Sequence, residues 1–227
     1  MLNNPIWKAL NSQQQGMSTG NDLARVFDAV VSPLSGMVEP SPEAYAALGE
    51  LAKDGRRVVL FLEQVVSPPA GWALEVEGAL TQMIWEGSAL PTVGVFDIEP
   101  LGETDVPEML ALAKLTKPGP FETKTITMGQ YLGIRQEGRL VAMAGERLHL
   151  SEGKDGYTEI SAVCTHPDFQ GRGYAKALMV ALMEGVLNRG EIPMLHAWKS
   201  NTGAIAVYEK LGFVESRVLQ CGMIRCV

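Results

Sequence analysis

Hydrophobic positions in the C-terminal half alternate between the spacing of strands and that of an amphipathic helix. Six apolar residues recur at intervals of three and four, as one helical face requires: Ala175, Leu178, Met179, Leu182, Met183 and Val186. Before this helix, Tyr157–Thr165 is apolar on both faces, which indicates a strand buried on both sides. After it we expect a strand at Pro193–Trp198, a helix from Asn201 to Lys210 and apolar strands over Phe213–Arg225.

The pattern directly upstream is also mixed α/β. We expect a strand at Val93–Ile98 and a helix at Asp105–Leu115. Tyr131–Arg135 and Arg139–His149 then have the pattern of two strands. The short loop Gln136–Gly138 between them contains glycine, so the sequence predicts a hairpin.

The N-terminal part predicts further α/β structure and carries no visible chemistry. Arg25–Val31 is an apolar run, and Ser41 is a candidate N-cap for a helix that extends to about Lys53. Val58–Leu62 fits a short strand, whereas Leu74–Trp85 fits either a strand or a helix.

The two halves of the chain differ in net charge, and the total charge limits the classes of partner that we expect. The chain has 227 residues, 46% of them hydrophobic, and a net charge of −7. Residues 1–94 carry −5 of this and residues 95–227 carry −2. The stretch Gly87–Thr92 between them is the candidate boundary, which gives an N-terminal extension over 1–90 and a second domain over 93–227. An acidic protein repels polyphosphates, so we expect no nucleic-acid partner, and the surplus carboxylates would suit a cationic amine.

Cysteine usage and the apolar runs predict the compartment. Cys164, Cys221 and Cys226 are too few and too scattered for a disulfide framework or a four-ligand zinc site. No apolar stretch approaches the roughly 20 residues that cross a bilayer, and Met1–Gly16 lacks the apolar core of a secretory signal. We expect a cytoplasmic protein with no metal site and no membrane contact.

Chemistry is concentrated in the glycine-bearing turn Gln170–Ala175. The turn lies between a buried strand and an amphipathic helix, so its backbone N–H groups can form an anion-binding nest, with Arg172 and Lys176 adding positive charge. A tight connection chosen for packing would look similar. A GxxxxGK[ST] phosphate loop fails because Tyr174 and Ala175 follow Gly173 in place of Lys and Ser or Thr. A GxGxxG dinucleotide fingerprint fails because Lys176 stands where the third glycine belongs.

A second block follows at Asn201–Phe213. The pair Gln170-x-x-Gly173-x-Ala175 and N-x-x-A-x-x-x-Y-x-x-x-G-F resembles the two signatures of the GNAT superfamily of acyl-CoA-dependent N-acyltransferases. The stretch Glu159–Pro167 and, more faintly, Asn4–Trp7 resemble its glycine N-acyltransferase-like branch. The resemblance implies an α/β fold over 93–227, with a mixed, mostly antiparallel central sheet flanked by helices, and residues 1–90 as a divergent partial copy of it.

The resemblance also implies a reaction and its residues. An amine would attack the thioester of acetyl-CoA, or of another acyl-CoA, bound between the Tyr157–Thr165 and Pro193–Trp198 strands, with no covalent enzyme intermediate. Tyr208 would protonate the departing thiolate. Glu159, with a pKa raised by burial, or His196 would be the base. Along an alternating strand, Glu159 would share a face with Val163. The residues implied in cofactor binding are Val163, Cys164, Thr165, Gln170, Gly171, Arg172, Gly173, Tyr174, Ala175, Lys176 and Asn201.

Each assignment has a structural alternative that the sequence leaves open. Tyr208 fits a core aromatic, Asn201 a helix cap, Cys164 a small buried strand residue and Glu159 a charge at a strand end. The rival function is an acyl-CoA-binding or regulatory module of the same fold without turnover. The acceptor, the acyl chain and the oligomeric state stay open, and a homodimer is compatible with the sequence.

Overall fold

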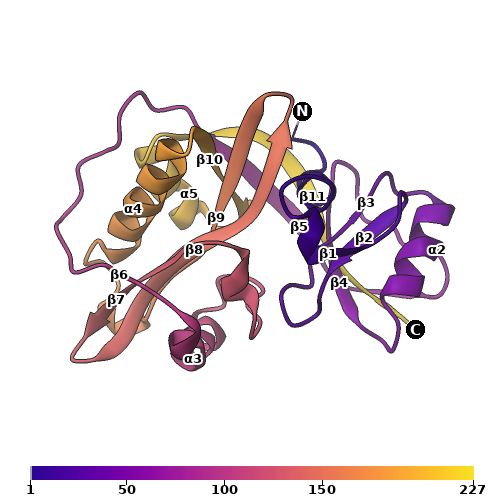
Figure 1. Cartoon of the computed structure of the whole chain (residues 1–227), viewed down its shortest axis with the longest axis horizontal. Helices are drawn as coiled ribbons and strands as arrows, with labels where there is room; N and C mark the ends of the chain where they lie inside the picture. The colour runs from indigo at the N-terminus through magenta and orange to yellow at the C-terminus, as the bar shows by residue number, and fades with distance from the viewer. Residues whose placement is uncertain (1) are drawn as a thin grey trace.

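The molecule is built on one eight-stranded sheet, with a small three-stranded sheet beside it (Figure 1). The computed structural model describes residues 2–227, except for the side chain of Glu152. Strand order in the large sheet is β4-β11-β5-β10-β9-β8-β7-β6, and β1-β2-β3 form the small sheet. Within the large sheet only the β9–β10 pair is parallel among the described strand pairs. This is the mixed, mostly antiparallel sheet flanked by helices that the sequence implied.

The elements follow the predicted order closely. The strands are β1 Ser18–Gly20, β2 Ala24–Phe27, β3 Ser35–Met37, β4 Arg57–Leu62, β5 Trp72–Trp85, β6 Glu99–Pro100, β7 Tyr131–Gln136, β8 Arg139–Glu152, β9 Asp155–Thr165, β10 Glu191–Trp198 and β11 Phe213–Cys226. The α-helices are α1 Pro5–Leu10, α2 Pro42–Leu51, α3 Val106–Thr116, α4 Tyr174–Asn188 and α5 Thr202–Lys210. Short 3-10 turns lie at Gln15–Met17, Glu103–Asp105, Thr125–Met128 and Pro167–Phe169.

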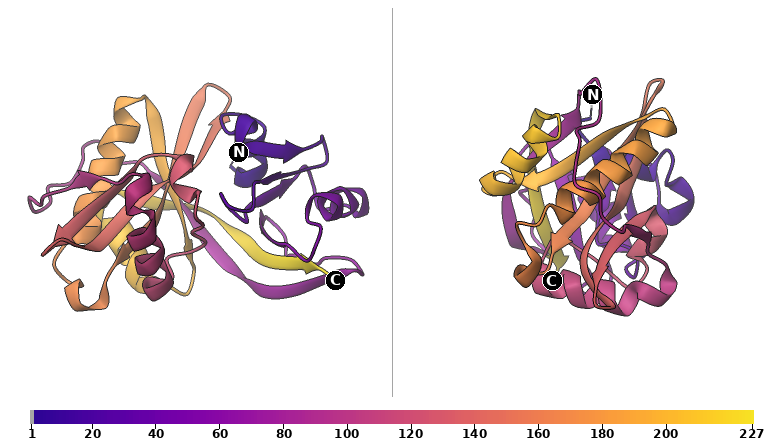
Figure 2. Two further views of the ribbon diagram at one scale, coloured as in Figure 1. Left: turned by 60° about the horizontal axis from the view of Figure 1, so that its bottom comes forward. Right: turned by 90° about the vertical axis from the view of Figure 1, so that its left-hand side faces the viewer.

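Strands β5 and β11 tie the N-terminal part to the rest. They pair antiparallel along almost their whole length and form a long ribbon that curves from the helices α4 and α5 toward β4 (Figure 2). Leu74–Trp85, ambiguous in the sequence, is therefore strand. The predicted boundary at Gly87–Thr92 is a loop, but strands from both sides of it share one sheet. The division into domains at this loop stays a prediction.

Helices α3 and α4 cover opposite faces of the large sheet. The apolar stripe of α4 is buried from Leu178 to Val186 and packs with Leu132 and Ile134 of β7. Tyr131 lies in the cluster beneath α3. Strand alternation produces this division, because neighbouring residues point to opposite faces. Among residues 2–227, none of the helices is long and apolar enough to cross a lipid bilayer.

One predicted strand is wrong. Val93–Ile98 has no strand pairing, and the edge strand β6 that follows is only two residues long. The apolar residues of Val93–Ile98 pack without the hydrogen bonds of a sheet. Phe96 and Ile98 contact the core cluster under α4, while Val95 is fully exposed. Pro100, which has no N–H to donate, ends the short pairing with β7.

Two irregularities in β9 open the sheet. The parallel pairing of β9 with β10 ends at Glu159–Met194. Beyond it, Ala162 has φ +54°, and the β8–β9 register shifts across Ala162 and Val163. This bulge interrupts the alternation that would place Val163 on the face of Glu159, so that part of the prediction fails. The strands separate here, which creates the opening expected between them.

Candidate active site

The turn between β9 and α4 has the geometry of an anion-binding nest. Gly171 and Gly173 have φ of +75° and +90°, a region that glycine enters without strain. Gly173 is the N-cap of α4, so the unpaired N–H groups and the positive end of the helix dipole lie at this turn. Arg172 and Lys176 line the same space. The turn is suited to a pyrophosphate group.

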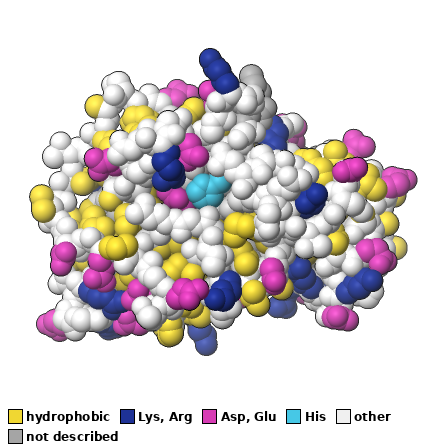
Figure 3. All heavy atoms as spheres, viewed as in Figure 1, with side chains coloured by type: hydrophobic (Ala, Val, Ile, Leu, Met, Phe, Trp, Pro, Cys, Tyr) yellow, Lys and Arg dark blue, Asp and Glu magenta, His cyan; other side chains and the backbone are white. Residues whose placement is uncertain are grey.

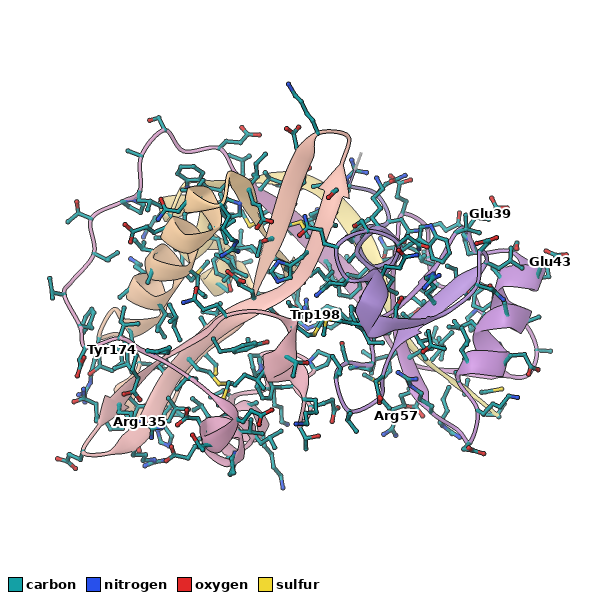
Figure 4. All side chains as sticks on the ribbon, in the orientation of Figure 1. Glu39, Glu43, Arg57, Arg135, Tyr174 and Trp198 are labelled. Carbon is teal, nitrogen blue, oxygen red and sulfur yellow. The ribbon has the colours of Figure 1, made fainter. Side chains whose placement is uncertain are left out.

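A cavity of about 630 Å³ extends from the nest to the opening between β9 and β10. All residues that the sequence implied in cofactor binding line it: Val163, Cys164, Thr165, Gln170, Gly171, Arg172, Gly173, Tyr174, Ala175, Lys176 and Asn201. In Figure 4, Tyr174 lies at the start of α4. Burial raises the pKa of the Cys164 thiol to about 11, so it stays protonated at neutral pH. The cavity fits a long ligand with a pyrophosphate at one end.

Helix α5 forms the opposite wall of this cavity. Asn201 accepts a hydrogen bond from the Ala204 N–H at 3.2 Å, which confirms it as the N-cap. Tyr208 contacts Phe213 in edge-to-face geometry and lines the cavity. Burial raises its pKa, so the phenol keeps its proton at neutral pH. It therefore combines the packing role and the proton that the sequence left as alternatives.

Glu159 is the centre of a buried polar triad drawn from three adjacent strands. Its side chain is 0% exposed. Arg147 of β8 donates to it twice, from Nε at 2.8 Å and from Nη2 at 2.6 Å. His196 of β10 lies on the other side, with Nδ1 2.7 Å from Glu159 Oε1. The structure thus joins the two candidate bases into one hydrogen-bonded unit instead of leaving them as alternatives.

The expected rise in the pKa of Glu159 is wrong. Burial by itself would raise it, but the charge and hydrogen bonds of Arg147, together with those of His196, lower it to about 2. Nor is Glu159 a charge at a water-facing strand end, since it is fully buried. At neutral pH it is an ionised partner of Arg147 and a weak proton acceptor.

Two residues of this unit were missed by the sequence reasoning. Arg147 interrupts an apolar run in β8, and a charged residue within such a run was the signal that could have found it. Gln82 of β5 places its amide nitrogen 2.9 Å from His196 Nε2 and 3.1 Å from the carbonyl oxygen of Leu2. Gln82 had no signal, because only the pairing of β5 with β10 brings it there.

A second cavity, of about 280 Å³, lies on the other side of the opening. The two cavities share five lining residues: Thr116, Val163, Asn201, Ala204 and Tyr208. Residues of the N-terminal part, including Leu34, Val59 and Phe61, form one wall of the second cavity. A ligand in each cavity would meet its neighbour at Tyr208, which is an arrangement suited to group transfer.

The family is decided by similarity to known proteins. The family model described as FR47-like protein matches residues 131–220. A [Ribosomal protein bS18]-alanine N-acetyltransferase of Escherichia coli (strain K12) is 30% identical over 127 residues, which cover 53% of this chain and 82% of that one. A crystal structure of a putative acetyltransferase from the GNAT family of Novosphingobium aromaticivorans covers 100% of this chain and 98% of its own, at 37% identity and a TM-score of 0.91. The chain belongs to the GNAT family of N-acetyltransferases.

Other GNAT relatives extend the picture without fixing an acceptor. A mycothiol acetyltransferase of Paenarthrobacter aurescens is 34% identical over 88 residues, 38% of this chain and 27% of that protein. A GCN5-related N-acetyltransferase from Kribbella flavida shares the fold at 16% identity and a TM-score of 0.63, covering 98% of this chain and 95% of that one. The activity of an N-acetyltransferase follows from the family assignment above, and these two relatives add only shared sequence and fold.

Proposed function

We propose that this enzyme transfers an acetyl group from acetyl-CoA to a primary amine by direct attack in a ternary complex. The observation that carries the proposal is the meeting of the two cavities at Tyr208. One cavity ends in the phosphate nest, and the other is open to an acceptor. Direct transfer needs both substrates side by side, and two cavities joined at the reacting groups provide this.

The main chain and the nest hold the cofactor in this proposal. Gly171, Gly173 and the start of α4 bind the pyrophosphate, with Arg172 and Lys176 as counter-charges. Among the described residues, neither β8 nor β10 pairs with Ala162 or Val163. Their backbone groups are therefore available to the pantetheine arm and the thioester carbonyl, whose polarisation favours attack.

The Glu159–His196 unit accepts the proton that the amine loses. Glu159 holds the imidazole by Nδ1 and would stabilise the imidazolium, as a carboxylate does in a triad. The proton must reach Nε2, which the Gln82 amide faces. The Gln82 amide therefore has to move away from Nε2 or rotate so that its oxygen faces the ring. That oxygen, Oε1, is buried without a partner among the described residues, and after rotation it would accept a hydrogen bond from the protonated ring. Tyr208 supplies the proton to the thiolate.

The finer family position and acceptor are also proposals. The residues Glu159–Pro167 and Asn4–Trp7 support a place in the glycine N-acyltransferase-like branch. The names of the relatives include an alanine of a ribosomal protein and mycothiol, so both a protein and a small molecule are represented. A longer acyl group remains an option for the donor.

Thiol release measured over a panel of amines tests the function. Acetyl-CoA and longer acyl-CoAs are titrated while thermal stability is followed, and the free thiol formed with each amine is then assayed. Stabilisation and turnover support the proposal. Stabilisation without turnover on any amine would instead support the binding or regulatory module. No response to any acyl-CoA would remove acetyl transfer as the function.

A further inference from the structure

The charge of the acceptor cavity is opposite to that of the whole protein. The cavity is the 280 Å³ space lined in part by Lys117, Arg147 and His196. None of its described lining residues is Asp or Glu. On the face drawn in Figure 3, by contrast, acidic and basic side chains are interspersed. The surplus carboxylates of the protein therefore do not line this cavity, and Glu159, the carboxylate directly behind its wall, is already paired with Arg147. A second positive charge on the acceptor would find no free carboxylate among the described lining residues.

The Arg147 guanidinium has one nitrogen, Nη1, that does not bond to Glu159 and faces this cavity. Its side chain is 8% exposed, and Nε and Nη2 donate to Glu159. Nη1 has no hydrogen-bond partner among the described residues. A Cβ added to Gly119, another lining residue, would lie 3.9 Å from Nη1, which places this nitrogen on the cavity side. A guanidinium can bind a second carboxylate through its free nitrogen while the first stays in place.

The remaining wall is apolar. It consists mainly of Leu34, Val59, Phe61, Val76, Leu80 and Met223. Trp198, at the middle of the molecule in Figure 4, packs on β5 so closely that a Cβ at Gly78 would lie 2.9 Å from its ring. It lines the cavity and is 40% exposed, so it forms an apolar rim. An aliphatic or aromatic side chain would bury its surface here.

We propose that the acceptor is a free α-amino acid with an apolar side chain, bound through its carboxylate to Arg147 Nη1. This rests on the proposed function. Arg147 Nη2 and His196 Nδ1 both bond to Glu159 Oε1, at 2.6 and 2.7 Å, so the guanidinium and the imidazole lie side by side on one carboxylate. An α-amino acid carries its amine and carboxylate on one carbon, which suits two binding groups that are neighbours.

The reaction balances with the groups already named. The amine nitrogen forms a bond to the acetyl carbon, and the carbon–sulfur bond of the thioester breaks. The acceptor enters as an ammonium and first loses one proton to His196, which passes it to solvent. The nitrogen loses its second proton as the carbon–sulfur bond breaks, which balances the proton that Tyr208 gives to the sulfur and regains. The products are an N-acetylamino acid, the free thiol and one proton.

The test varies the acceptor, because replacing Arg147 would leave Glu159 buried without its partner. Rates of thiol release are compared for L-leucine, L-leucinamide and 3-methylbutylamine, and for the matching series of L-methionine and L-phenylalanine. We expect kcat/KM for the amino acid to exceed that of the amide and the amine by about 10- to 100-fold, the range for a charge-assisted hydrogen bond. Equal or higher kcat/KM for the amide, the amine or a dipeptide would overturn the proposal.

A binding experiment separates this inference from the proposed function. With CoA present, N-acetyl-L-leucine should raise the melting temperature more than N-acetyl-L-leucinamide, even where no transfer is seen. The reverse order, or no difference, would overturn the carboxylate site.

A variant of the cavity wall tests the apolar part. Met223→Trp should raise KM for L-leucine at least fivefold by filling the cavity. Val214→Trp, at an exposed position of the same strand outside the cavity, is the matched control and should leave KM unchanged. Equal KM in both variants would refute an apolar side-chain site.

Discussion

Replacing Glu159 with Gln removes one negative charge from a fully buried site. Glu159 is 0% exposed and Arg147 is 8% exposed, so the guanidinium would remain buried without its carboxylate. Breaking a buried pair in this way costs about 3–5 kcal/mol. For a chain of this size the melting temperature falls by about 2–4 °C per kcal/mol, so we expect a drop of roughly 6–20 °C in Glu159→Gln.

Urea unfolding, followed by tryptophan fluorescence and by circular dichroism, measures this loss. The informative control is the double variant Glu159→Gln with Arg147→Met, which removes both charges and keeps much of the buried volume. We expect the double variant to be more stable than Glu159→Gln alone, because no charge is left unpaired. A loss below about 1 kcal/mol in the single variant, or additive losses in the double variant, would refute the buried pair.

Three further outcomes test other parts of the site. The free energy of unfolding should fall as pH drops from about 4.5 toward 2, because the pKa of Glu159 is about 2 in the folded protein and higher in the unfolded chain. The fall should be smaller in Glu159→Gln. Equal acid sensitivity of the two proteins would contradict the pKa shift. Tyr208→Phe should lower kcat by about 10² to 10⁴-fold with little change in KM for acetyl-CoA, and an unchanged kcat would exclude Tyr208 as the acid. Gly173→Ala forces a residue with a side chain into φ +90°, so KM for acetyl-CoA should rise by about 5- to 30-fold. The control is Gly138→Ala, which creates similar strain at φ +79° in a distant hairpin. Equal KM in the two variants would contradict the phosphate nest.

Local pattern was enough to predict most of the elements. The structure of α4 is encoded locally by the helical spacing of its apolar residues. The turn at Gln136–Gly138 is encoded locally by a glycine that can adopt positive φ. The same holds for the phosphate nest, which is made of consecutive residues. Spacing alone therefore identified the cofactor side of the site.

Features that depend on contacts between residues far apart in the sequence were harder to predict from the sequence. Val93–Ile98 has the composition of a strand but no neighbour with which to pair. The pKa of Glu159 was predicted in the wrong direction because the sequence gives its burial but not the guanidinium from β8. Gln82 is 114 residues from the histidine that it contacts. Only strand order settles such pairings.

The N-terminal part explains why an acidic protein can have a basic acceptor cavity. Leu34, Val59 and Phe61 supply apolar surface and no charge, so they close the cavity without adding a carboxylate to compete for Arg147, which is paired with Glu159 alone among the described carboxylates. The Phe61 ring lies 5.1 Å from the His196 ring and 5.9 Å from the Arg147 guanidinium, so it covers one side of both groups. A low local dielectric strengthens the attraction between a cationic anchor and an anionic ligand, whereas the acidic surface outside is screened by salt. Residues 1–90 would then contribute to selectivity for the side chain of the acceptor, while Arg147 selects its carboxylate and the sheet and helices that follow carry the chemistry.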